Sequence, residues 1–237
     1  MTQRTWQIRA AACLLLACAG VPARAGSIYI NGLPVGGGAV TVRPESFQER
    51  KFRTTVAQQH DFSCGSAALA TLLTHTYGLP ATEQEVFAGM FDNGDKAVIS
   101  EQGFSLLDMK AYLARRGLTA EGYRAPLQKL IDIKVPAIVL VNVRGYNHFV
   151  VVEGVRDGLV LMSDPAVGIR TASVSEFQEQ WGGIFFLILT GAGRVQQKYN
   201  AAEKWAVAPP APNGLARYVV DLILLAQPAA ARNSGRF

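Results

Sequence analysis

The pattern of apolar and polar positions changes from helical to strand-like along the chain. Segments rich in Ala and Leu, or with apolar residues every three or four positions, predict four helices at residues 65–77, 82–91, 106–116 and 126–131. Apolar, β-branched runs then predict strands at residues 137–143, 148–155, 159–164 and 184–189, with a short helix at 175–181. This order indicates an α+β fold in which N-terminal helices pack on a C-terminal antiparallel sheet.

Residues that begin and end helices support these boundaries. Gly78 and Pro80 follow the first helix in the order expected of a helix C-terminus. Thr82 and Glu85 have the spacing of a capping box before the second helix, and Ser105 introduces the third. Residues 52–58 are expected to form a short strand that leads to the first of these helices.

The chain divides into four segments. Residues 1–25 are expected to be a signal peptide, residues 26–51 an extended leader, residues 52–192 the folded domain, and residues 193–237 a Pro- and Ala-rich extension. The extension is expected to be a linker, with an amphipathic segment at residues 217–227 that would form a short helix. Gly36–Gly38 in the leader is not followed by Lys-Ser or Lys-Thr, which argues against a phosphate-binding loop.

The N-terminus has the three parts of a secretory signal. Arg4 and Arg9 precede an apolar stretch, residues 10–20, and Ala23-Arg24-Ala25 provides a small-x-small cleavage site, so the mature chain would start at Gly26. A competing interpretation takes residues 15–18 as a lipoprotein box with Cys18 as the acylated residue. Either interpretation predicts export, with the periplasm as the destination, and no later apolar run is long enough to span a membrane.

Charge and composition exclude some classes of function. The 237 residues are 49% hydrophobic and 17% charged, as in a globular protein. The formal charge of +5 includes three arginines of the signal, and without them 20 basic residues face 18 acidic ones. This near balance gives no reason to expect nucleic-acid binding.

Cys64 would be the only cysteine of the mature chain, because Cys13 and Cys18 lie in the signal. A disulfide framework is therefore not expected. Cys64 opens the first predicted helix, where unpaired N–H groups and the helix dipole favour a thiolate. A buried structural cysteine is the alternative interpretation, since many free cysteines are small core residues.

Three histidines are candidates for a base beside this thiol. His75 lies eleven residues along the same helix, about 16 Å from Cys64 along the axis, which is too far. His60 lies in the loop before Cys64 and stays an alternative. His148 begins a strand, and a three-residue hairpin loop centred on Asp157 would bring it opposite residue 166, with Asp164 as a diagonal neighbour.

Gln58 precedes Cys64 by six residues and could provide a second donor, with the backbone N–H of Cys64, for an oxyanion. One cysteine and three scattered histidines give no metal-ligand spacing. Neither a metal nor another cofactor is expected.

Three motifs in order resemble the bacteriocin-processing cysteine peptidases, family 39 of the papain-like clan. They are residues 58–68 with Gln58 and Cys64-Gly65, residues 148–152 from His148, and Asp164-Pro165 with the three residues after it. The resemblance covers about residues 52–190 and implies a papain-like fold, with Cys64 as nucleophile, His148 as base, Asp164 as its orienting group and Gln58 in the oxyanion hole.

The chain differs from many members of that family in two respects. Ser63 stands where many have Asp, and a predicted signal peptide is present in place of a fused export transporter. In these respects the chain is more similar to stand-alone exported members, such as the one that accompanies functional-amyloid (Fap) secretion systems.

The sequence therefore predicts an exported cysteine endopeptidase whose substrate is a secreted leader or a fibre-forming protein. The alternative is a non-hydrolytic papain-like accessory module that binds an exported or amyloid-forming client. A weaker alternative is another acyl-transfer enzyme on the same fold, such as a cell-wall amidase.

Overall fold

The computed structural model describes residues 28–30, 40–42 and 45–208. The predicted signal peptide, the Gly36–Gly38 run and the predicted helix at 217–227 lie outside the described residues. The chain forms two compact units, residues 1–46 and residues 47–237. In the first unit, β1 (Ile28–Ile30) and β2 (Val40–Val42) pair in antiparallel fashion.

The second unit begins with helices, as the sequence predicts. A short π-helix, Leu72–Thr76, continues α2 and completes the helix expected at residues 65–77. The α-helices before the sheet are α1 (Phe47–Lys51), α2 (Cys64–Thr71), α3 (Glu83–Phe91), α4 (Lys96–Gln102) and α5 (Leu106–Arg115).

Local hydrogen bonds explain where two of these helices start. Thr82 and Glu85 form a complete capping box at α3, with each side chain bonded to the other residue's backbone N–H. Ser105 and Asp108 form the same arrangement at α5. Both predicted helix starts are confirmed, and a cap of this kind contributes about 1 kcal/mol.

The rest of the second unit forms a six-stranded sheet in the order β3-β8-β4-β5-β6-β7, in which all neighbours are antiparallel. The α+β prediction, with helices followed by an antiparallel sheet, is confirmed. The strands are β3 (Ala120–Arg124), β4 (Ala137–Val143), β5 (Tyr146–Arg156), β6 (Leu159–Asp164), β7 (Gly168–Ser173) and β8 (Trp181–Ile188). Helix α6 (Leu127–Ile133) connects β3 to β4, and helix α7 (Val174–Gln180) connects β7 to β8.

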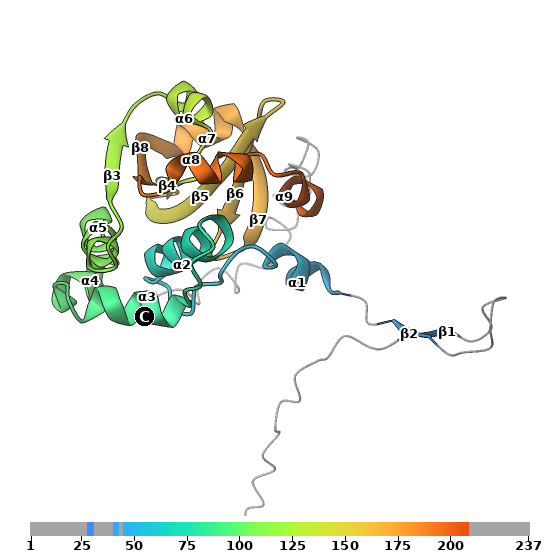
Figure 1. Cartoon of the computed structure of the whole chain (residues 1–237), viewed down its shortest axis with the longest axis horizontal. Coiled ribbons are helices and arrows are strands. Elements are labelled where there is room, and N and C mark those ends of the chain that lie inside the picture. The colour runs from blue at the N-terminus through green and yellow to red at the C-terminus, as the bar shows by residue number, and fades with distance from the viewer. Residues whose placement is uncertain (1–27, 31–39, 43–44, 209–237) are drawn as a thin grey trace, which may run out of the picture. The chain divides into compact units, whose positions relative to one another are not determined.

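Both faces of the sheet are covered, so this unit has three layers. On one face, α2, the π-helix and α5 contribute Leu69, Leu73 and Met109 to an apolar cluster that also contains Val151 and Phe186 of the sheet. On the other face, α6 and α7 contribute to a second apolar cluster. Figure 1 shows α2 and α3 on one side of the sheet and α6 and α7 on the other. The central strands are therefore nearly continuous apolar runs, as in sheets buried on both sides.

The hairpin of β5 and β6 contains a bulge that alters its register. Arg156 pairs with Leu159 across a two-residue turn, in which Asp157 and Gly158 both have positive φ. The predicted three-residue loop is wrong, because positive φ at both positions gives the tighter turn. The register then shifts by one residue between Val152 and Gly154.

Several elements differ from the predictions. Residues 52–58 form turns instead of a strand, because their N–H groups bond within the chain's own turns and to the Thr71 hydroxyl. The helix expected at 175–181 starts one residue earlier and is capped by Ser173. Strands β3 and β7 and the short helices α1 and α4 were not predicted, because their sequences mix polar and apolar residues without a clear period.

The segment after Gly193, which was predicted to be a linker, is folded as far as residue 208. It forms α8 (Ala192–Val195), a 3₁₀ turn and α9 (Ala202–Val207). The buried Lys204 ammonium lies 2.7 Å from the buried Glu153 carboxylate in the β5 bulge. Asn200 also binds this part of β5, by donating to the carbonyls of Glu153 and Val155. This segment is thus part of the folded unit.

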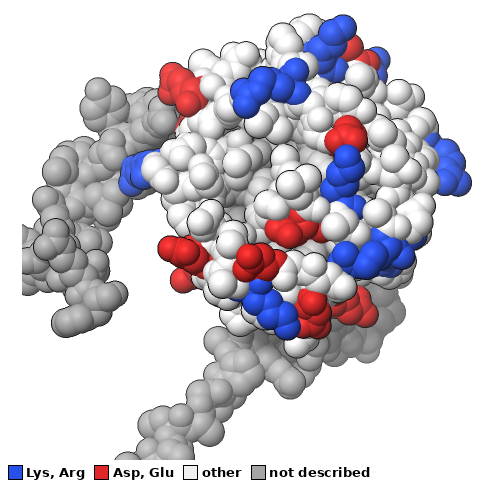
Figure 2. Space-filling view, turned by 90° about the vertical axis from the view of Figure 1, so that its left-hand side faces the viewer, with Lys and Arg blue, Asp and Glu red and all other residues white. Residues whose placement is uncertain are grey.

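The surface mixes charges of both signs. On the face shown in Figure 2, Lys and Arg are interspersed with Asp and Glu. Within the part of the chain that the structure describes, no helix combines the length and apolar character needed to cross a membrane.

Candidate active site

The candidate nucleophile Cys64 is the first residue of α2 and is buried. The glycine that follows it allows close packing: a Cβ at Gly65 would lie 2.9 Å from the Met109 side chain and 3.4 Å from the Phe149 ring. Phe149 is the neighbour of His148 on β5. The first turn of α2 can therefore pack tightly against Met109 of α5 and against Phe104, 3.1 Å from that Cβ position, because residue 65 has no side chain.

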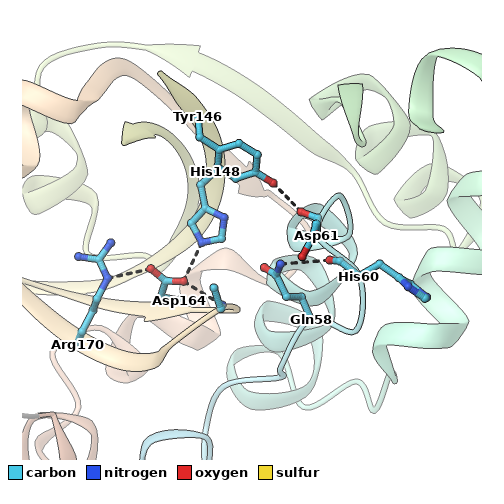
Figure 3. A network of polar contacts seen from close by, with 8 residues as sticks. Gln58, His60, Asp61, Tyr146, His148, Asp164 and Arg170 are labelled. Carbon is cyan, nitrogen blue, oxygen red and sulfur yellow. Dashed lines mark hydrogen bonds and ion pairs between the residues drawn. The ribbon is translucent and has the colours of Figure 1, made fainter. Parts of the chain in front are cut away.

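The loop before Cys64 is held by its own hydrogen bonds. The Ser63 hydroxyl accepts from the His60 N–H at 3.1 Å and donates to the His60 carbonyl at 3.0 Å. Tyr146, in β5, donates its hydroxyl to the Asp61 carbonyl at 2.5 Å. Figure 3 shows this bond linking the start of β5 to the loop. Ser63 thus fixes the conformation of the loop, at the position where many members of the resembled family have Asp.

His148 and Asp164 form a buried pair. The Nε2 atom of His148 lies 2.7 Å from Oδ1 of Asp164, and both residues are less than a tenth exposed. Burial alone would lower the pKa of His148, but hydrogen bonds to the side chains of Asp164 and Cys64, and the charges of both groups, raise it from 6.5 to about 9. The imidazole is therefore bonded to the carboxylate, and its pKa also responds to the Cys64 side chain.

Asp164 is held by more partners than His148. Its Oδ1 accepts from the Ala166 N–H at 3.0 Å, and its Oδ2 accepts from Nε of Arg170 at 2.8 Å (Figure 3). Burial raises the pKa of Asp164, but the His148 and Arg170 interactions outweigh it and lower the pKa from 3.8 to about 2. Asp164 is therefore an anion at neutral pH, with its orientation fixed.

Arg170 was not found from the sequence, because β7 was not predicted. Arg170 pairs with Met162 and Asp164 pairs with Gly168, so both side chains belong to the same face of the β6–β7 hairpin. If β7 had been recognised, the turn at residues 165–167 and strand alternation would have indicated that Arg170 lies beside Asp164.

The bulge in β5 decides which face His148 occupies. From Arg156 to Gly154, the pairs between β5 and β6 follow the register that the turn sets. If this register continued without a shift, Asp164 would lie opposite Val151. His148 and Val151 point to opposite faces of the sheet. After the shift, Val151 pairs with Ser163, so that Asp164 comes beside Val150, on the face of His148. The predicted diagonal relation thus holds because the bulge compensates for the shorter turn.

Gln58 lies close to this pair but has its own partners. Its backbone N–H donates to the Pro165 carbonyl at 3.0 Å, which ties it to the turn after Asp164. Its side-chain nitrogen donates to the His60 carbonyl at 3.1 Å (Figure 3). A Gln amide has two N–H groups, so this bond leaves one for another acceptor. Its buried carbonyl oxygen accepts no hydrogen bond from the described residues.

The other two histidines lie in different surroundings. The His60 ring packs against Phe62 and Phe87, with centroids 5.8 and 5.7 Å apart. His75 lies in the π-helix after α2, and burial and the Lys204 charge lower its pKa against the opposing effect of Glu153. His148 is thus the histidine whose pKa responds to Cys64.

Among the described residues, no group of three or more His, Cys, Asp or Glu side chains is arranged to hold a metal ion. The groups that are assembled are a thiol at a helix N-terminus, an imidazole and a carboxylate. These are the groups that cysteine peptidases use for acyl transfer.

Comparison with known proteins agrees with this class. The model of the Peptidase C39 family matches residues 53–192, and the chain belongs to that family of cysteine peptidases. A probable functional amyloid protease FapD of Pseudomonas fluorescens is 42% identical over 204 residues, which cover 86% of each chain. A probable functional amyloid protease FapD of Pseudomonas aeruginosa is 42% identical over 175 residues, 74% of this chain and 77% of that one.

Two solved structures are also similar. The peptidase domain of Streptococcus ComA, a bifunctional ABC transporter involved in quorum sensing, has a TM-score of 0.49 and 23% identity, over 57% of this chain and 96% of that one. A double glycine motif protease from an AMS/PCAT transporter, in complex with its leader peptide, has a TM-score of 0.48 and 27% identity, over 56% and 88% of the two chains.

Proposed function

We propose that this protein is an exported cysteine endopeptidase in which Cys64, His148, Asp164 and Gln58 carry out the hydrolysis of a peptide bond. The observation that supports this proposal most strongly is the buried imidazole of His148, which bonds to the Asp164 carboxylate at 2.7 Å and whose pKa is also raised by the Cys64 side chain. A structural cysteine does not require this arrangement.

The first half of the reaction forms a thioester. At neutral pH the raised pKa keeps His148 protonated, and the positive ring favours a thiolate at Cys64. The sulfur attacks the carbonyl carbon of the substrate, and the carbonyl oxygen becomes negatively charged. The bond to nitrogen then breaks as His148 gives its proton to the leaving amine, which departs with the C-terminal part of the substrate.

The second half releases the N-terminal part of the substrate. A water molecule attacks the thioester carbon while the neutral imidazole takes its proton, and the acyl group leaves as a carboxylic acid. The Cys64 backbone N–H and the second amide N–H of Gln58 stabilise the oxyanion in both halves. One such donor typically contributes a factor of about 10² to 10³ in kcat. Asp164 orients the imidazole and stabilises its charged form.

The substrate is an exported protein that belongs to a functional-amyloid system. This part of the proposal is supported by the FapD proteases of two Pseudomonas species, each 42% identical to this chain, and by the secretory signal predicted for residues 1–25. Cleavage takes place in the periplasm, after signal processing at Gly26. Acylation of Cys18 would instead leave the same enzyme attached to a membrane.

Incubation with a candidate amyloid-forming protein, followed by mass spectrometry of the products, tests the proposal. Wild type is expected to give a defined cut, Cys64→Ala and His148→Ala to lose it, and His60→Ala to keep it. The biological assay is fibre secretion by cells that carry Cys64→Ser. Normal secretion in those cells would refute the peptidase and favour the accessory module, and release of peptidoglycan fragments would favour an amidase.

A further inference from the structure

A cleft of about 400 Å³ opens beside the His148–Asp164 pair and has no role in the steps above. One wall comes from the β4–β5 connection, with Val143 and Tyr146, and another from the turn after β6, with Ala166 and Val167. Helix α7 contributes Glu176 and Gln180, which form a polar end of the cleft. The imidazole therefore lies at the boundary between the cleft and the candidate nucleophile.

The exposed surface of this cleft is mainly apolar. Tyr146 is 53% exposed and Val167 is 43% exposed, so neither side chain is used to fill the core. The groups of the lining that can carry charge are Asp164, which pairs with Arg170 at 2.8 Å and with His148 at 2.7 Å, and Glu176 of α7. Adjacent exposed apolar side chains in a concave surface are typical of a binding site, whereas single ones are not.

The chemistry of the reaction says which part of a substrate reaches this cleft. His148 gives its proton to the leaving amine, so the residue that follows the scissile bond starts at the imidazole. None of the side chains that line the cleft comes from α2 or α3. In Figure 3, the Asp164 and Arg170 side chains lie on one side of His148, and the loop with Gln58 and Asp61 lies on the other. Tyr146, which also lines the cleft, reaches toward this loop. The cleft therefore adjoins the imidazole on a side that α2 and α3 do not line, and there we place the leaving-group side of the substrate.

We propose that this cleft is the subsite for the side chain immediately after the scissile bond, and that it selects an apolar side chain such as Leu, Ile, Val, Met or Phe. This inference rests on the proposed function. Charged side chains are disfavoured, because they would lose water against the apolar walls of Val143, Tyr146 and Val167, and because Asp164 and Arg170 already pair with each other. A hydrophobic pocket of this kind discriminates by a factor of roughly 10 to 200.

Val167 is the position at which the subsite can be changed without disturbing the fold. Its side chain is exposed, and its N–H bonds to the Asp164 carbonyl at 3.3 Å whatever its side chain is. Val98 in α4 is a matched control, since it is a valine with 45% exposure that does not line the cleft.

The test is a digest of a proteome-derived peptide library, in which mass spectrometry identifies the residue after each cut. Wild type, Val167→Asp, Val167→Ala and Val98→Asp are compared, with Cys64→Ala as background, and melting temperatures verify that each variant is folded. We expect apolar residues after the cut to be enriched about tenfold in wild type and Val98→Asp. Val167→Ala should reduce this enrichment, and Val167→Asp should abolish it and admit Lys and Arg.

The outcomes separate the two proposals. Cleavage that depends on Cys64 but shows no preference after the cut would overturn the subsite and leave the peptidase intact. A preference that Val167→Asp does not change, or that Val98→Asp changes equally, would also overturn the subsite. If no peptide is cut in a manner that depends on Cys64, the proposed function fails and the subsite fails with it.

Discussion

Asp164→Asn is the substitution that tests most directly how the buried pair works. The rise of the His148 pKa from 6.5 to about 9 corresponds to roughly 3 kcal/mol in favour of the charged ring. Burial acts in the opposite direction, so the neighbouring anions must more than offset it. Without the Asp164 charge, the His148 pKa should fall well below 9, because burial then acts against the Cys64 interaction alone.

The assay is an NMR titration of ¹³C-labelled histidine in the folded protein. Three histidines give three curves, and His148→Ala identifies the one that belongs to this site. His75 provides an internal reference, because burial and Lys204 lower its pKa. Asp157→Asn is the control, since Asp157 lies in the hairpin turn and its side chain is 85% exposed. A His148 midpoint that remains near 9 in Asp164→Asn, or that moves equally in the control, would refute the reasoning.

The same pair should make stability depend on pH. The His148 pKa is raised on folding, so its contribution is complete below pH 6.5 and is lost as the pH rises through about 9. The Asp164 pKa is lowered, so its contribution is complete above pH 3.8 and is lost as the pH falls through about 2. Urea unfolding at pH 5.5 and 9.5 should therefore show a loss of stability in wild type that is smaller in Asp164→Asn. Equal losses would contradict this.

Three further predictions concern the nucleophile and its supports. Iodoacetamide should alkylate Cys64 faster in wild type than in His148→Ala at pH 6.5, with Cys64→Ala as background, because the imidazolium favours the thiolate; equal rates would indicate a structural cysteine. Gly65→Val should push the start of α2 away from Met109 and Phe104, at a cost of about 1–3 kcal/mol in unfolding free energy. It should also cause a larger relative loss in kcat than in KM, because Cys64 is the preceding residue. Gly193→Val should do neither, because a Cβ at Gly193 would meet no atom within 4 Å. Lys204→Met should destabilise the fold by about 3–5 kcal/mol, because it leaves the buried Glu153 carboxylate unpaired. In urea unfolding, the double variant with Glu153→Gln should recover most of this loss of stability. Additive losses from the two substitutions would show that the pair is not coupled.

Local signals in the sequence were sufficient for much of the fold. Thr82 and Glu85 begin α3 through contacts three residues apart, and Asp157-Gly158 makes a hairpin because both residues tolerate positive φ. The order of the helices and strands followed from such signals. The edge strands β3 and β7 did not, because they contain residues such as Glu121 and Arg170, whose side chains find partners on other elements.

The candidate site was predictable only in part for the same reason. The Cys64 helix and the hairpin of His148 and Asp164 are readable from local spacing, although the roles of these residues stay predictions. The bulge is not readable from the sequence, because β5 is a nearly continuous apolar run without an alternation that a bulge would break. The partner of Glu153, Lys204, lies in a helix that was expected to be a linker. The backbone N–H of Gln58 bonds to the Pro165 carbonyl, a contact between residues far apart in the sequence that no local pattern predicts.

Because of the bulge at Glu153, the number of residues between His148 and Asp164 decides whether the two side chains lie on the same face of the β5–β6 hairpin. A deletion of one residue between His148 and Asp164 would keep the strands paired and the apolar runs intact, yet it would turn one of the two side chains to the opposite face. Changes of length by two residues would keep both side chains on the same face. Single-residue insertions and deletions in this hairpin should therefore yield proteins that fold but lack activity, so selection acts here on the number of residues as well as on their identity.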